Sequence, residues 1–84
     1  MSRQLEKAQE LKVTTNIAGV PVSLTRNNRL ERVAAIYEHW RLSDEWWDKK
    51  VERDYFRVRT STGIVFDIYR DAMSNRWYLD RIHD

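Results

Sequence analysis

Residues 55–82 read YFRVRTSTGIVFDIYRDAMSNRWYLDRI. Apolar and polar side chains alternate in three runs of this stretch, at 55–60, 64–70 and 76–82. The dividing segments, Ser61-Thr62-Gly63 and Ser74-Asn75, consist of residues that favour turns. Alternation of this length is typical of half-buried strands, in which every second side chain faces a core. The stretch therefore predicts a three-stranded antiparallel meander.

The alternation also assigns a face to each side chain of the meander. Ile64, Phe66 and Ile68 fall on one face of the second run. In the third run, Trp77 and Leu79 share a face, while Tyr78, Asp80 and Ile82 fall on the other. We expect the faces that carry Phe66 and Trp77 to form the core.

A hairpin is predicted upstream of the meander. A β-favouring run at 13–17 ends at Ala18-Gly19, and residues 20–25 alternate again on the far side of this turn. Pro21 cannot donate a ladder hydrogen bond, so it belongs at a strand start or at an edge. The following Asn27-Asn28 pair tolerates the positive φ angles of a tight turn.

Residues 30–40 fit two different elements. Apolar residues at Leu30, Val33, Ala34 and Tyr37 have helical spacing, and Asn28 with Glu31 would form a capping box for a helix at about 29–41. In a strand, Ile36 and Trp40 share a face, and a single bulge would bring Val33 into line with them. The pattern leaves both the helix and a long bent strand open.

The remaining segments are polar. Residues 2–12 offer few apolar contacts for a helix, so we expect a flexible leader at 1–11 and a single domain at 12–84. Residues 43–54 are predicted to form a charged loop around Trp46-Trp47. The expected fold is mainly β, with five or six antiparallel strands closing into a small SH3-like barrel; the alternative is an α+β fold with the helix at 29–41.

Composition narrows the class of protein. A chain of 84 residues buries only about 60% of its unfolded surface, so its four Trp, four Tyr and two Phe must supply much of the core. The absence of cysteine excludes disulfides and thiolate metal sites, and no apolar run is long enough to span a membrane. We expect a cytoplasmic protein.

No catalytic apparatus is recognisable. His39 and His83 have no neighbours at metal-ligand or triad spacing. The carboxylates that could form an acid–base pair lie opposite arginines on the predicted strands, where ion pairing explains them; they are Asp67, Asp71 and Asp80, facing Arg57, Arg59, Arg70 and Arg81. The sequence predicts neither an enzyme, nor a metal site, nor a cofactor.

The candidate binding residues are aromatic side chains and arginines. Net charge is +2, and eleven of the fifteen basic residues are Arg, interleaved with thirteen acidic residues, so nucleic-acid binding is allowed and not demanded. Tyrosines beside arginines on a sheet are typical of single-stranded nucleic-acid platforms, because rings stack on bases and guanidinium groups contact phosphates. The predicted set is Trp46, Trp47, Arg53, Tyr55, Arg57, Arg59, Tyr69 and Tyr78, with a second basic patch at Arg26, Arg29 and Arg32. The alternative is that both tryptophans close one end of the barrel and that the Tyr/Arg face is an ordinary solvated surface.

Several aromatic landmarks resemble a known family. They are Gly19-x-Pro21, Val33-x-x-Ile36-x-x-x-Trp40, Trp46-Trp47, Arg53-x-x-Phe56-x-Val58, Tyr69-x-Asp71 and Trp77-Tyr78-Leu79-x-Arg81-x-x-Asp84. Together they resemble a small, uncharacterised bacterial domain that occurs alone or attached to Y-family (ImuB-like) error-prone DNA polymerase subunits. The chain departs from that pattern at Arg26, Asn27 and Asn28, where an aromatic residue and a glycine are expected. The missing ring weakens any stacking role for this turn.

The resemblance implies a non-catalytic accessory module in DNA repair or translesion replication, with a DNA polymerase subunit or single-stranded DNA as its partner. The alternative from a different class is a structural domain that forms a homodimer through its aromatic surface.

Overall fold

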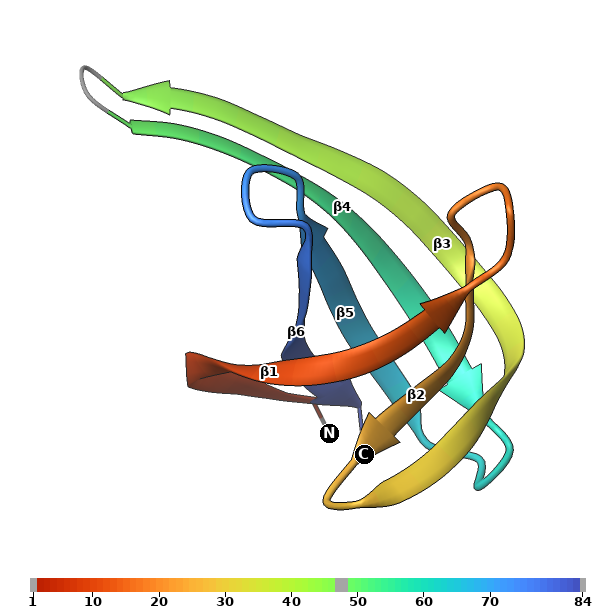
Figure 1. Ribbon diagram of the computed structural model, residues 1–84. Coiled ribbons are helices and arrows are strands. Elements are labelled where there is room, and N and C mark those ends of the chain that lie inside the picture. The colour runs from red at the N-terminus through yellow and green to blue at the C-terminus, as the bar shows by residue number, and fades with distance from the viewer. Residues whose placement is uncertain (1, 47–48, 84) are drawn as a thin grey trace.

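Six antiparallel strands form a closed barrel in the computed structural model (Figure 1), which describes residues 2–46 and 49–83, with side chains for 9–45 and 50–83. Each strand pairs with the next in the sequence, and the first pairs with the last. The strands are β1 (Ser2–Thr15), β2 (Pro21–Arg26), β3 (Arg29–Trp46), β4 (Lys49–Thr60), β5 (Val65–Asp71) and β6 (Arg76–His83). The predicted small antiparallel barrel is therefore confirmed.

Positive φ angles mark the turns that the sequence indicated. Asn27 and Asn28 have φ angles of 52° and 62°, and their turn joins β2 to β3. Asn75 adopts 61° between β5 and β6, and Gly63 adopts 89° between β4 and β5. Asparagine and glycine occupy these positions because other residues meet steric strain in the left-handed region.

The ambiguous segment is a strand, and the alternative of a helix at 29–41 is wrong. Two bulges interrupt its ladder with β4, between Val33 and Ala35 and between Ile36 and Glu38. Each bulge adds one residue, so the side chains on the inner face of β3 are three residues apart, at Val33, Ile36 and His39. Two bulges in succession thus imitate the spacing of an amphipathic helix.

The core lies inside the barrel, and every strand contributes to it. Phe66, Ile68 and Val58 are completely buried at its centre. The other members of the cluster are Leu11, Leu24, Phe56, Trp77 and Leu79, with Val13, Val33, Ile64 and Ile82 packed against them.

Ile82 was expected on the opposite face. A bulge at Asp80 corrects this prediction, because β5 pairs Asp67 with Arg81 but Ile68 with Leu79. The extra residue restores Ile82 to the face of Leu79.

Two polar segments also differ from expectation. Residues 2–11, within the expected leader, belong to β1, whose ladder with β6 includes the pairs Ser2–His83 and Leu11–Trp77. Of the expected loop at 43–54, residues 43–46 belong to β3 and residues 49–54 to β4; the two strands extend past the rest of the barrel as a two-stranded arm (Figure 1). In both cases backbone pairing with a neighbour overrides a polar sequence.

The described part of the chain contains no helix, and hence none that is long and apolar enough to cross a membrane.

Candidate functional site

The predicted Tyr/Arg face lies on the outside of the barrel and is built around a ladder of rings. Trp40, Tyr55, Tyr69 and Tyr78 occupy paired positions on β3, β4, β5 and β6. Their successive ring centroids are 5.2, 5.0 and 5.3 Å apart. Because the rings cover one another, Tyr55 and Tyr69 are only 7% and 5% exposed.

The two arginines between these rings are engaged within the chain. The Arg57 guanidinium donates to both carboxylate oxygens of Asp67, at 2.8 and 3.2 Å, and also approaches Glu38. Arg53 lies 4.5 Å above the Tyr69 ring and donates to the Tyr55 hydroxyl. The inner rings of this face therefore pack against protein and offer no free surface for a base.

Asp67 is the electrostatic centre of the outer face. Its side chain is buried, and His83 Nε2 lies 3.0 Å from its second oxygen. Burial by itself raises the pKa of a carboxyl, but the hydrogen bonds from Arg57 and the nearby His83 ring outweigh it and hold the pKa of Asp67 below the ordinary value. Asp67 is thus a structural anion that joins β4, β5 and β6.

The other predicted arginines lie on β2, β3 and β4. Arg59 on β4 and Arg32 on β3 are exposed, and no ion pair to either is seen among the described side chains. Arg26 approaches the buried Glu31, which accepts hydrogen bonds from the hydroxyls of Thr60 and Thr62.

Arg29 lines a cavity of about 670 Å³ beside the β2–β3 turn, together with Arg26, Leu30 and Glu31. Arg32 is not part of this cavity. Arg26 and Arg29 pair across the β2–β3 hairpin, and Arg32 pairs with Ser23 further along the same ladder. The second basic patch at these three arginines stays a prediction.

Trp46 ends β3, but its side chain lies outside the described residues, as does the whole of Trp47. The predicted role of this pair stays a prediction.

The outer edge of β3 is the first feature that the sequence did not reveal. β2 pairs with β3 only over Arg29–Arg32. From Val33 onward β3 pairs with β4 on one side, and no described strand pairs with its other side. Such an edge presents unpaired backbone N–H and C=O groups along its length.

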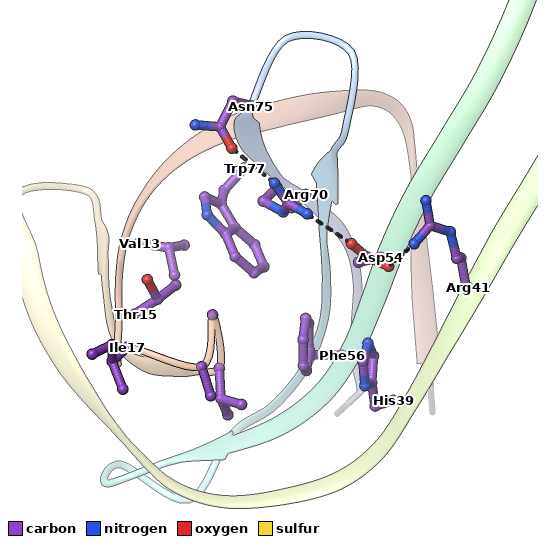
Figure 2. Close-up of a pocket in the computed structure, with 13 residues that line it drawn as sticks. Val13, Thr15, Ile17, His39, Arg41, Asp54, Phe56, Arg70, Asn75 and Trp77 are labelled. Atoms are coloured by element: carbon purple, nitrogen blue, oxygen red, sulfur yellow. Dashed lines mark hydrogen bonds and ion pairs between the residues drawn. The ribbon is translucent and has the colours of Figure 1, made fainter.

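The second feature is a cavity of about 700 Å³ at the mouth of the barrel (Figure 2). Apolar side chains on one side of it come from β1 and the β1–β2 loop, including Val13 and Ile17. Phe56 and Trp77 stand on the other side, with ring centroids 5.7 Å apart. His39 lies flat against Phe56, at 4.2 Å and an interplanar angle of 7°.

A chain of polar contacts runs along the rim of this cavity (Figure 2). Arg70 donates to Asn75 and to Asp54, both at 2.9 Å. Asp54 also approaches Arg41 at 3.7 Å, and Arg41 reaches Glu52 at 3.5 Å. The mouth therefore combines an aromatic wall with an Arg–Asp–Arg rim.

The described side chains contain no group of three or more His, Cys, Asp or Glu that could hold a metal ion. The stacking of His39 on Phe56 gives this histidine a packing role at the mouth.

Sequence reasoning placed Trp77 on the core face but missed its neighbours at the mouth, which are His39, Arg41, Asp54 and Arg70. The two bulges in β3 turn the side chains of His39 and Arg41 toward the inside of the barrel. No single residue in the sequence indicates where a bulge lies. Alternation along β4 and β5 could have placed Asp54 and Arg70 on the face of Phe56 and Ile68.

Comparison with known families gives one match. Residues 3–84 match the family described as a domain of unknown function, DUF6504, and the chain belongs to that family. The expectation of a small, uncharacterised domain is confirmed, but the family description names no activity and contains no link to ImuB-like polymerases. No curated protein and no solved structure matches.

Proposed function

We propose that this member of the DUF6504 family is a non-catalytic binding module that takes up an extended segment of a protein partner along the free edge of β3. The observation that carries the proposal is the unpaired length of β3 beyond Arg32. An extended peptide can add to such an edge as a further strand, with backbone hydrogen bonds supplying affinity.

The side chains of the free section support this mode. Ile36, Tyr37 and Leu42 are 39%, 53% and 41% exposed. Soluble proteins normally cover unpaired strand edges and large exposed apolar side chains, and this section of β3 has both. A bound partner strand would cover both the backbone groups and part of these side chains.

Single-stranded nucleic acid is the second candidate, and the exposed Arg32 and Arg59 favour it. The two residues lie on neighbouring strands, since Ser61 N donates to the Arg32 carbonyl at 2.8 Å. Against it, Arg57 and Arg70 already contact carboxylates of the chain at short distance, which reduces the charge available to phosphates. A protein partner is therefore the better-supported class.

The setting of this function rests on the sequence resemblance. The similarity to domains attached to ImuB-like polymerase subunits suggests a cytoplasmic role in translesion replication, with a polymerase subunit as the partner protein. A homodimer formed through β3 is the alternative assembly.

The test is a nuclear magnetic resonance titration of the isotope-labelled full chain with a soluble peptide of alternating Val and Thr. We expect the amide resonances of residues 33–42 to shift, with smaller changes elsewhere. The matched control is the same peptide N-methylated at every residue, which has no amide N–H to donate from either edge.

Three outcomes contradict the proposal. Absence of any shift at millimolar peptide means that the edge does not accept a strand. A concentration-dependent dimer in light scattering, with β3 already protected, assigns the edge to self-assembly. Tight binding of a single-stranded oligonucleotide, weakening steeply with salt while the peptide has no effect, transfers the function to nucleic acid.

A further inference from the structure

The barrel-mouth cavity borders the free edge of β3. β2 begins at Pro21, which has no N–H to donate, and the β2–β3 ladder starts two residues later with Ser23 opposite Arg32. Past this point the β1–β2 loop lines one side of the cavity, and His39 and Arg41 of β3 line the other. A strand added to β3 would run beside this opening.

We propose that the mouth is the pocket that selects the partner, an inference that rests on the proposed function. The pocket takes one large apolar side chain of the added strand, and acidic residues lie beside it on the same face of that strand. Side chains two residues apart on a strand point the same way. An apolar residue facing the cavity is then flanked by neighbours that face the rim.

The apolar part of the pocket fits a large side chain. Ile17 is fully exposed at the opening, and no described residue covers it. Phe56 and Trp77 are buried behind it, and the cavity of about 700 Å³ lies in the size range of small-ligand sites. An aromatic or branched side chain in the pocket would cover Ile17 and pack against the ring of His39.

The charge at the rim determines which residues are favoured beside this apolar side chain in the partner strand. Among the residues that line the cavity, the cations are Arg41 and Arg70, and the carboxylate that both approach is Asp54. Cations therefore outnumber anions by one. Arg41 is the adaptable member, because its side chain is 58% exposed and its contacts, at 3.5 and 3.7 Å, are long.

The experiment compares labelled alternating peptides by fluorescence anisotropy on the full chain. The central, cavity-facing residue is Phe or Ala, and the residues two positions to either side are both Glu or both Lys. We expect the Phe peptide to bind about tenfold more tightly than the Ala peptide, and Glu to be favoured over Lys about threefold to fivefold.

Two variants with matched controls locate the effect. Ile17→Thr is expected to reduce the advantage of Phe about threefold, and Arg41→Gln to remove the preference for Glu. Leu30→Thr changes another exposed apolar residue, which lies outside this cavity, and Arg76→Gln changes an exposed arginine outside it that pairs with Glu10. Neither control should alter the affinities.

The outcomes separate the pocket from the proposed function. Equal binding of the Phe and Ala peptides, while the resonances of residues 33–42 still shift, overturns the pocket and leaves strand addition intact. Failure of every peptide to shift those resonances overturns strand addition itself, and the pocket with it. A preference for Lys over Glu, or a concentration-dependent dimer in light scattering that Ile17→Thr abolishes, also rejects the proposed ligand.

Discussion

Asp67 shows how a single carboxylate organises the outer surface of the barrel. It is 3% exposed and receives two hydrogen bonds from Arg57, with His83 Nε2 3.0 Å away. Removing one partner of a buried charge pair leaves the other uncompensated, which costs more than the pair contributes in place. The residue therefore joins three strands through one side chain.

Asp67→Asn is predicted to lower the free energy of unfolding by about 2 kcal/mol, as measured by urea denaturation. Glu10→Gln is the control, since Glu10 is exposed and lies 3.9 Å from Arg76; it should cost less than about 0.5 kcal/mol. Equal effects of the two substitutions would show that the contacts of Asp67 with Arg57 and His83 do not stabilise the fold more than a surface ion pair does.

Asp80 and Asp67 are expected to change the stability of the fold with pH in opposite directions. Burial, chiefly, raises the pKa of Asp80 above the ordinary value, so its ionised form destabilises the folded state at neutral pH. Below the unfolded pKa of about 3.9, Asp80 is protonated in both the folded and the unfolded state, so this destabilisation disappears there. Asp67 behaves in reverse: its lowered pKa stabilises the fold above about pH 3.9, and this stability is lost as pH falls through its folded pKa.

Asp80→Asn is accordingly predicted to raise the free energy of unfolding at pH 7, with the gain shrinking to zero at about pH 3. Urea denaturation at several pH values checks this. A gain that persists unchanged at low pH would mean that charge is not its cause.

Among the elements, the β2–β3 turn is the one whose backbone the sequence determines most directly. Asn27 and Asn28 both have positive φ, as a two-residue hairpin turn of this hand requires. Asparagine tolerates this region, but glycine tolerates it better.

Asn28→Gly is predicted to stabilise the fold by up to about 0.5 kcal/mol, and Asn28→Ala to destabilise it by about 1 kcal/mol. Thermal unfolding followed by circular dichroism measures both changes. Ser61→Ala, in a turn position without positive φ, should be close to neutral. If Asn28→Gly and Asn28→Ala change stability in the same direction, φ strain does not control this turn.

Element by element, the sequence was most informative where alternation is undisturbed. The runs around Val58, Phe66 and Trp77 are strands with the expected faces. It was least informative where bulges change the period, at Ala34 and Tyr37 in β3 and at Asp80 in β6. A bulge is set by pairing with a neighbouring strand, so it is absent from local propensity.

At the scale of the whole molecule, stability depends on a small core. The largest fully buried side chain is Phe66, and the Arg26 guanidinium lies 5.0 Å above its ring. A domain of this size has few further contacts to compensate for a lost aromatic residue.

Phe66→Ala is predicted to cost about 3–5 kcal/mol, enough to leave much of the population unfolded at 37 °C. Near-ultraviolet circular dichroism and a thermal melt would report the loss. Met73→Ala, at a 65% exposed position, serves as the control and should melt with the wild type. A cooperative melt of Phe66→Ala within a few degrees of wild type would contradict this view of the core.

The candidate site could not be predicted in full because it exists only in the assembled barrel. The outward position of Tyr55 and Tyr69 followed from alternation, but their burial follows from each other and from rings on two further strands, β3 and β6. The mouth draws Val13, His39, Arg70 and Trp77 from four strands, and no stretch of sequence holds more than a part of it.

The pairing of β1 with β6 has a kinetic consequence. Residues near opposite ends of the described chain, such as Ser2 and His83, meet in one ladder. During synthesis, the N-terminal strand must wait for the last eight-residue strand before its hydrogen-bonding partner exists. The barrel can therefore complete folding only after translation has passed His83, and until then β1 depends on β2 alone.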